Sequence, residues 1–309
     1  MFHHVTVLLK ETVDNVVQNP HGIYVDMTLG GGGHSHEIAS RLAADGCLIG
    51  IDRDAAALQA ARQRLEQMRC RIHLVQRNYI EINEVVNELG FTGVDGIVCD
   101  LGVSSYQLDT EERGFSYQHD APLDMRMDQR QELTAATVVN TYSAKELAQV
   151  IRQYGEERFA NRIAQRIVAR RENGLLTTTG ELVEVIKAAI PAATRRTGPH
   201  PAKRTFQAIR IEVNGELRDL ETAVCNAIRT LKPGGKIGII SFHSLEDRII
   251  KHTFRDLARD CICPPELPVC QCGHQATLRN VSKAIRPIEQ ELEDNPRARS
   301  AILRVAEKV

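Results

Sequence analysis

The chain has 309 residues and a mass of 34.5 kDa, enough for an α/β core and one smaller domain. Its 42% hydrophobic and 26% charged residues are typical of a soluble globular protein, and a net charge of −1 gives no general attraction to nucleic acid. No apolar run reaches the ~18 residues of a membrane helix and the N-terminus lacks a signal-peptide layout, so we expect a cytoplasmic protein that does not enter membranes.

The first predicted strand, at residues 23–25, is followed by four consecutive glycines at 30–33 and then by a helix-like segment. A second apolar run, CLIGID, ends in Asp52, which lies 22 residues after Gly30 (52 − 30 = 22). Strand, glycine turn, helix, strand and terminal acid form the first half of a nucleotide-binding α/β unit. Glycines let the backbone approach the ligand, and the acid accepts hydrogen bonds from ribose hydroxyls.

The spacing of the glycines indicates which nucleotide binds. A dinucleotide site requires G-x-G-x-x-G, but Ser35 occupies the position of the third glycine. The pattern D-x-x-x-G-x-G, from Asp26 through Gly30 to Gly32, is similar to the S-adenosylmethionine loop of class I methyltransferases. The alternative, a merely flexible turn, leaves the acid at Asp52 unexplained.

The alternation of strands and helices predicts a parallel sheet with right-handed crossovers. It is interrupted by a block with several amphipathic helices and no convincing strand. We therefore predict one α/β domain made of both chain ends, at 1–105 and 204–309, with an all-helical domain, 106–203, inserted after the fourth strand. The further predicted elements are helix 54–68, strand 71–77, helix 80–89, strand 94–102, helix 215–231, turn 231–235, strand 236–242, helix 244–258 and strands 283–288 and 300–308.

Ligands of open parallel sheets bind beyond the carboxyl ends of the strands. Besides the glycine loop and Asp52, two residues are expected there: Tyr79, after the third strand, and Asp100, at the end of the fourth. Tyr79 could lie against an adenine ring or could only fill the core. Asp100 could contact the cofactor or could cap a helix.

Asp100 and His243 are the candidate catalytic residues. Amino-group methyltransferases usually carry Asp/Asn/Ser-Pro-Pro-aromatic after the fourth strand, and here only the acid matches. A carboxylate that accepts a hydrogen bond from a nucleobase amine would help that amine to attack a methyl group. Phe242 and His243 leave a later strand at the same edge, where one could stack on an extruded base and the other could take up a proton. The alternative is an ordinary strand end with Ser244 as the helix cap.

Basic residues gather in the predicted helical domain. Arginines recur at every fourth position of one helix, and another pair lies in the loop that ends the block. Such residues could bind RNA phosphates or could form a solvated face. The predicted RNA-binding surface comprises Arg158, Arg162, Arg166, Arg170, Arg195 and Arg196.

Four cysteines lie within the segment CICPPELPVCQCGH, as two C-x-C pairs at positions 261, 263, 270 and 272. They could hold a structural zinc ion, form labile disulfides or remain free thiols. The spacing does not decide among these states, and no metal ligand is assigned.

A series of motifs extends across nearly the whole chain: GGGGHS, DLGVSS-x-QLD, RGFSY, PLDMRM, YGEERFA-x-RIA, RTFQAIRI-x-VN-x-EL, ISFHSLEDR and NPRARSA-x-LR. In this order they resemble the RsmH (MraW) family of bacterial 16S rRNA cytosine-N4 methyltransferases. The resemblance implies a Rossmann-like class I methyltransferase domain with a helical insert, which transfers a methyl group from S-adenosyl-L-methionine to N4 of a cytidine near the decoding centre of the small ribosomal subunit. The family's cofactor contacts correspond to Gly32, Gly33, His34, Asp52, Tyr79, Asp100 and Gln107.

Two other functions are compatible with parts of the sequence. A nicotinamide dehydrogenase would share the first half of the fold, but the missing third glycine and the early insert count against it. A zinc-stabilised RNA-binding or assembly factor without activity would explain the arginines and cysteines, but not the glycine loop with Asp52.

Overall fold

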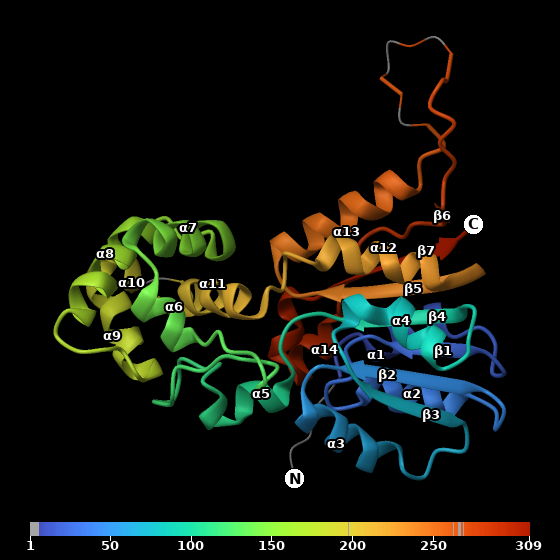
Figure 1. The fold of residues 1–309 in the computed structure, drawn as a ribbon, viewed down its shortest axis with the longest axis horizontal. Helices are drawn as coiled ribbons and strands as arrows, with labels where there is room; N and C mark the ends of the chain where they lie inside the picture. The colour runs from blue at the N-terminus through green and yellow to red at the C-terminus, as the bar shows by residue number, and fades with distance from the viewer. Residues whose placement is uncertain (1–5, 197, 262, 265–266, 268) are drawn as a thin grey trace. The chain divides into compact units, whose positions relative to one another are not determined.

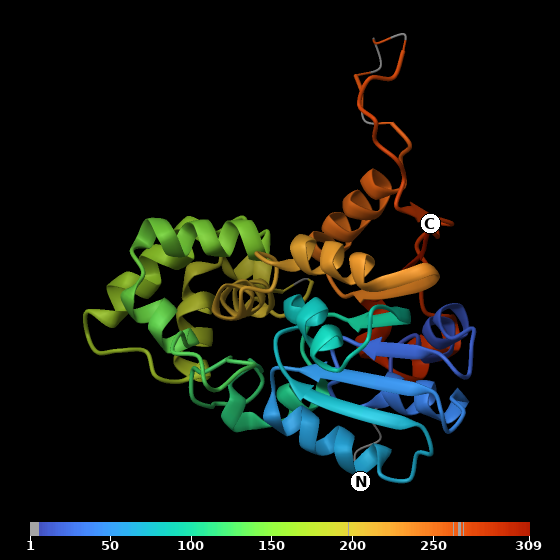
Figure 2. The ribbon, with the colours of Figure 1, turned by 45° about the vertical axis from the view of Figure 1, so that its right-hand side comes forward.

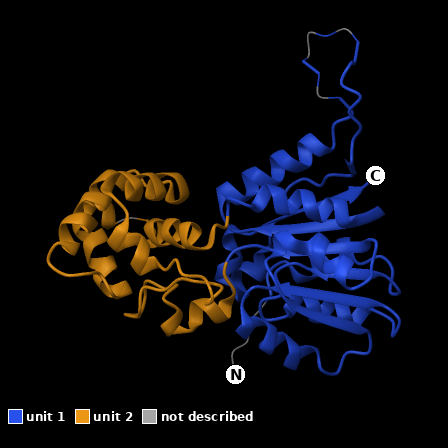
Figure 3. Cartoon of the chain, viewed as in Figure 1, with its two compact units in different colours: residues 1–102, 217–309 blue, residues 103–216 orange. Residues whose placement is uncertain are grey.

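The computed structural model describes residues 6–196, 198–261, 263–264, 267 and 269–309. The chain divides into two compact units (Figure 3). The first consists of Met1–Gly102 and Leu217–Val309, and the second of Val103–Glu216.

The first unit contains a mixed sheet with the strand order β3-β2-β1-β4-β5-β7-β6 (Figure 1). Strands β1 to β5 pair in parallel, whereas β7 is antiparallel to both of its neighbours. The α/β class predicted from the sequence is thereby confirmed. The strands are β1 (Ile23–Asp26), β2 (Cys47–Asp52), β3 (Arg71–Gln76), β4 (Val94–Asp100), β5 (Leu231–Ser241), β6 (Leu278–Arg279) and β7 (Ile302–Lys308).

Helices cover both faces of this sheet, as two separate apolar clusters show (Figure 1, Figure 2). On one face, strand residues such as Ile49 and Ile97 pack against α4, α12 and α13. On the other face, Leu48 and Val98 pack against α1, α2 and α3. Adjacent residues therefore point to opposite, equally buried faces, which is why these strands are continuous apolar runs. The helices of this unit are α1 (Leu9–Val16), α2 (Gly33–Arg41), α3 (Ala55–Leu65), η1 (Tyr79–Glu81), α4 (Ile82–Glu88), α12 (Leu220–Thr230), α13 (Ser244–Leu257), α14 (Glu289–Asp294) and η3 (Pro296–Ser300).

The C-terminal part of the sheet differs from the prediction in two places. The expected turn at 231–235 lies inside β5, where the pairing with β4 shifts register between Val94 and Gly96. The expected strand 283–288 is reduced to one isolated bridge, between Ile285 and Leu303. Pro287 has no N–H to donate to a sheet, so it opposes a regular strand there. On the side of β7 that does not pair with β5, the short β6 takes the place of the expected strand.

The second unit is helical and has its own apolar core. It ends at Glu216 rather than at residue 203, because Phe206, Ile209 and Val213 of α11 belong to that core. Its helices are α5 (Ser105–Asp109), η2 (Glu111–Arg113), α6 (Ala135–Thr141), α7 (Ala144–Gly155), α8 (Ala160–Arg171), α9 (Thr179–Ala189), α10 (Ala192–Arg195) and α11 (Lys203–Asn214).

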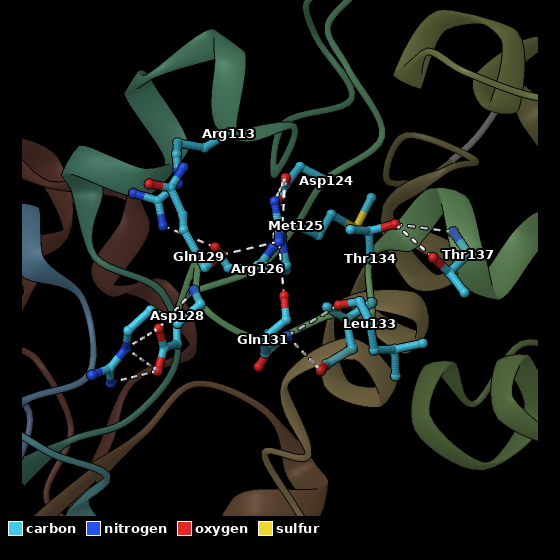
Figure 4. Close-up of polar contacts among 12 residues, drawn as sticks. Arg113, Asp124, Met125, Arg126, Asp128, Gln129, Gln131, Leu133, Thr134 and Thr137 are labelled. Carbon is cyan, nitrogen blue, oxygen red and sulfur yellow. Dashed lines mark hydrogen bonds and ion pairs between the residues drawn. The ribbon is translucent and has the colours of Figure 1, made fainter.

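The segment between η2 and α6 has no regular structure and is fixed by its own polar side chains (Figure 4). Arg126 forms a two-pronged ion pair with Asp124, with Nε–Oδ1 at 3.0 Å and Nη2–Oδ2 at 2.7 Å. The same guanidinium donates to the carbonyls of Gln129 and Gln131. Arg113 donates to the carbonyl of Arg126 at 2.8 Å. These charge-assisted bonds satisfy carbonyl groups that no helix or strand satisfies.

Among the residues that the structure describes, no helix is both long enough and apolar enough to cross a membrane.

Candidate functional site

Three acids end three neighbouring strands of the first unit. Asp26 is the last residue of β1, Asp52 of β2 and Asp100 of β4. Because β2, β1 and β4 are adjacent and parallel, all three lie at one edge of the sheet. The chain order thus brings together the predicted residues Asp52 and Asp100 at the edge where such sheets bind ligands.

The glycine loop connects β1 to α2 at this edge. Gly30 and Gly32 have φ angles of 47° and 71°, a left-handed conformation that side chains with a Cβ rarely adopt. Gly32 is the N-cap of α2, and Gly33 begins that helix. The four-glycine run therefore forms a specific turn into a helix rather than a flexible linker.

Asp52 fixes this loop. Its Oδ2 accepts a hydrogen bond from the N–H of Gly30 at 2.8 Å, and its Oδ1 accepts one from the N–H of Asp54 at 2.8 Å. Asp54 in turn caps α3 by accepting from the N–H of Ala56. One carboxylate thus holds both the glycine loop and the start of the next helix. Burial raises the pKa of Asp52, while its two backbone hydrogen bonds lower it.

Asp26, the first residue of the D-x-x-x-G-x-G pattern, is a second anchor of the loop. It is 1% exposed and accepts hydrogen bonds from Ser35 Oγ at 2.7 Å and from the N–H of Thr28 at 3.2 Å. Ser35 is the residue that replaces the third glycine of the dinucleotide pattern, so its hydroxyl has a role in holding the loop. Burial raises the pKa of Asp26 to about 6, although both hydrogen bonds lower it.

Of the three acids at the strand ends, Asp100 is the one with a carboxylate oxygen that accepts no hydrogen bond from the described residues. Its backbone N–H donates to Thr28 Oγ1, which ties β4 to the loop after β1. Its Oδ2 lies 3.7 Å from Nδ1 of His34, a residue that is 4% exposed. Its Oδ1 is buried and has no hydrogen-bond donor among the described residues. Asp100 caps no helix, because α5 begins later and is capped by Ser104.

The electrostatics of this edge favour a cationic ligand. Burial, and after it the charges of Asp26 and Glu246, raise the pKa of Asp100 well above its ordinary value. The pKa values of Asp26 and Asp52 are raised as well. A positive charge brought to this edge would offset the cost of ionising these carboxyls, whereas a pyrophosphate would add to it. This group of carboxylates therefore fits a sulfonium and ammonium compound such as S-adenosylmethionine better than a dinucleotide.

His243 has a structural role at the end of β5. It is the N-cap of α13: its Nδ1 accepts from the N–H of Glu246 at 3.4 Å, and Glu246 accepts from the N–H of His243 at 3.2 Å. The expected cap, Ser244, is instead the first residue of the helix. Glu246 is 2% exposed and also accepts from the N–H of Phe242. The spacing from His243 to Glu246 is that of a capping box, a signal missed because histidine is an unusual cap.

The last two predicted cofactor residues belong to short helices that follow strands β3 and β4. Tyr79 begins η1, three positions after the last residue of β3, and it is partly buried against one of the apolar clusters of the sheet. Gln107 belongs to the second unit. It is 5% exposed and completes the capping box of α5 with Ser104. The S-x-x-Q spacing of Ser104 and Gln107 is a capping-box signal from which the start of α5 could have been predicted.

The predicted arginine stripe consists of residues in different situations. Arg162 and Arg166 are exposed on α8, and no described acidic residue forms an ion pair with either. Arg170 forms an ion pair with Glu181 at 3.0 Å. Arg158 precedes α8, is exposed, and lies over the ring of Phe159 with 4.7 Å between Cζ and the ring centroid. The remaining pair, Arg195 and Arg196, is exposed at the end of α10.

A groove of about 570 Å³ lies between α7 and α8, and its lining includes the residues directly before Arg162 and Arg166. Most of the surface that lines the groove is apolar, although six of its eight lining residues have polar or basic side chains. The lining residues are Ala144, Lys145, Ala148, Gln149, Arg152, Gln153, Asn161 and Gln165.

Comparison with known proteins places the whole chain in one family. The family model described as "MraW methylase family" matches residues 1–309. The chain is 56% identical to "Ribosomal RNA small subunit methyltransferase H" of Brevibacillus brevis, over 100% of this chain and 98% of that protein. Proteins of the same name from Clostridioides difficile and Symbiobacterium thermophilum are each 53% identical over 100% of this chain, and the matches cover 99% and 97% of those proteins. The chain therefore belongs to the MraW methylase family.

Proposed function

We propose that this chain transfers a methyl group from S-adenosylmethionine to N4 of a cytidine in 16S rRNA, near the decoding centre of the small ribosomal subunit. Its membership of a methylase family and the names of its relatives support an rRNA methyltransferase. The observation that carries the choice of cofactor is the group of buried acids at the strand ends, which suits a cationic ligand. We place this activity in the cytoplasm, where ribosomal subunits assemble.

In the proposed binding mode the glycine loop receives the cofactor. Gly32, Gly33 and His34 face it at the start of α2, and Asp52 accepts hydrogen bonds from the ribose hydroxyls. Each oxygen of Asp52 accepts one backbone N–H and has a second lone pair, so this role is compatible with its hold on the loop. Tyr79 is the proposed neighbour of the adenine ring. Gln107 is carried over from the family resemblance alone.

Asp100 is the proposed catalytic residue. S-adenosylmethionine supplies an electrophilic methyl group, and transfer leaves S-adenosylhomocysteine and a proton released from the nitrogen. The N4 amine of cytosine is a weak nucleophile because its lone pair is conjugated with the ring. Asp100 Oδ1 is a buried acceptor that could bind an N–H of this amine and help it pyramidalise during attack. His34, 3.7 Å from the other oxygen, would hold the carboxyl in position.

His243 is a weaker candidate for proton transfer than the sequence suggested. Its Nδ1 is committed to capping α13, and its Nε2 lies 3.2 Å from Glu246 Oε1. We propose that His243 and Glu246 together fix the strand end that presents Phe242. Phe242 is half-buried, and its ring lies next to Gly102, directly after β4. It is available at this edge for stacking on a base.

Arg162 and Arg166, with Lys145 and Arg152 of the adjacent groove, are the proposed contacts to rRNA phosphates. They are exposed basic groups on two neighbouring helices. Arg170 is not included in this surface, because it forms an ion pair with Glu181 of the same unit.

A reconstituted reaction tests the proposal. The purified protein is incubated with labelled S-adenosylmethionine and small ribosomal subunits from a strain that lacks the enzyme, and the rRNA is digested to nucleosides. The proposal predicts label in N4-methylcytidine. Label in another nucleoside, or none with any ribosomal substrate, would contradict it. The variant Asp100→Asn serves as the matched control for methyl transfer that does not depend on this site.

A further inference from the structure

The four clustered cysteines, which the methyl-transfer site does not use, lie in the segment between α13 and β6. In Figure 1 and Figure 2 the described parts of this segment lie beyond the end of α13 and lead back to β6. A backbone hydrogen bond of 2.8 Å, from the N–H of Thr277 to the carbonyl of Leu257, closes its base. The thiols of all four residues come together within it: Cys261, Cys263, Cys270 and Cys272.

The geometry of the sulfur atoms is that of a metal site. The three distances among Cys261, Cys270 and Cys272 are 3.4, 3.5 and 3.8 Å, and all four sulfurs lie within 4.8 Å of one another. Four sulfurs placed tetrahedrally at the Zn–S bond length of ~2.3 Å are ~3.8 Å apart. Three of the sulfurs thus already form one face of such a tetrahedron.

Backbone N–H groups support the sulfurs in this arrangement. The N–H of Cys263 donates to Cys261 Sγ at 3.4 Å, and the N–H of Gln271 donates to Cys263 Sγ at 3.4 Å. Donors directed at a sulfur stabilise its thiolate form, which is the form that binds metal.

The segment also lacks an apolar core, among its described residues, that could hold these thiols together without a metal. Leu267 and Val269 are 44% and 68% exposed, so their side chains contribute little burial. A short segment of this kind needs a cross-link, and a bound metal ion supplies one directly as folding free energy.

We propose that Cys261, Cys263, Cys270 and Cys272 bind one structural zinc ion. Four thiolates with no open position form a closed site, so the ion organises the segment and does not activate water. Disulfides explain the geometry less well, because three sulfurs are mutually close and none has a single preferred partner. A set of soft thiolate ligands selects zinc over hard cations such as magnesium.

Metal analysis of the full chain, purified without a metal-binding tag, tests the proposal. We expect one zinc per chain by mass spectrometry of the metals, and its loss from the double variant Cys261→Ser/Cys270→Ser. The control Cys225→Ser removes a partly buried thiol of α12, outside the cluster, and should retain the zinc.

Thiol labelling of the wild-type chain keeps the test decisive even if the double variant does not fold. The four cluster cysteines should resist alkylation until a chelator is added, and all four should then react. Three results would overturn the proposal: absence of zinc with thiols that label freely, an intact mass showing disulfides, or stoichiometric iron with inorganic sulfide.

Discussion

Replacing Asp52 by asparagine separates two roles of this residue, since its carboxylate holds the glycine loop and is proposed to bind the cofactor ribose. Asp52 accepts the N–H groups of Gly30 and Asp54, each at 2.8 Å. Asparagine has one carbonyl oxygen, so its NH₂ group must face one of these two donors. One charge-assisted hydrogen bond is lost, and the free energy of unfolding should fall by about 1.5–3 kcal/mol.

The same substitution, Asp52→Asn, should also weaken binding of the cofactor. Ribose hydroxyls that face a weakened or missing acceptor lose about 1.5–3 kcal/mol, which weakens S-adenosylmethionine binding by roughly ten- to a hundredfold. Isothermal titration measures this, at a temperature where circular dichroism shows the variant to be folded. The control is Asp54→Asn, because asparagine also caps helices and α3 keeps its start.

Two results would refute this reasoning. An unchanged dissociation constant in folded Asp52→Asn would place Asp52 outside the cofactor site. An equal loss of affinity in Asp54→Asn would assign the effect to the removal of a negative charge near this edge rather than to a ribose contact of Asp52.

Three further predictions concern charge. Because the folded-state pKa of Asp26 is raised from 3.8 to about 6, its contribution to stability is present below pH ~4 and is lost as pH rises through ~6. Urea denaturation should therefore show that the free energy of unfolding of the wild type, relative to that of Asp26→Asn, falls by about 3 kcal/mol between these pH values. A difference between the two proteins that does not change with pH would contradict this prediction. Charge reversal at Arg162 and Arg166 should reduce the slope of log binding constant against log salt concentration, measured for rRNA, by about two units. Charge reversal at Arg62 and Arg229, which are exposed in the first unit, should leave this slope unchanged. Equal slopes for wild type and the Arg162/Arg166 variant would make α8 an ordinary solvated face. Asp100→Asn should lower the single-turnover methylation rate by about 10²-fold or more while cofactor affinity changes by less than about tenfold, and a full rate would exclude a catalytic role.

The sequence predicted the first half of the sheet well because its signals are local. Strands β1, β2 and β4 are mostly buried apolar segments with core residues on both faces of the sheet, and each ends in an acid. The positions of Asp52 and Asp100 at one edge follow from parallel pairing alone. The α/β class and the ligand-binding edge can therefore be predicted from the order of residues along the chain.

Other features depend on contacts between distant residues. The predicted end of the helical domain, residue 203, was wrong by one helix, because only the packing of Phe206 and Ile209 assigns α11 to the helical core. The role of Asp26 depends on Ser35, which comes within 2.7 Å only after the glycine loop has turned. The arginine stripe was read from spacing, but Glu181, on a different helix, neutralises Arg170. The four thiols lie within one twelve-residue segment, from Cys261 to Cys272, but only the fold of that segment brings their sulfur atoms together.

Mass mapping of 16S rRNA from a strain that lacks this protein tests the central claim most directly. We predict that one cytidine near the decoding centre loses a single methyl group from its N4 position. Reintroducing the wild-type gene should restore this methyl group, whereas a gene that encodes Asp100→Asn should not. A methylation pattern identical to that of the parent strain, or a methyl group lost from a different base, would contradict the account.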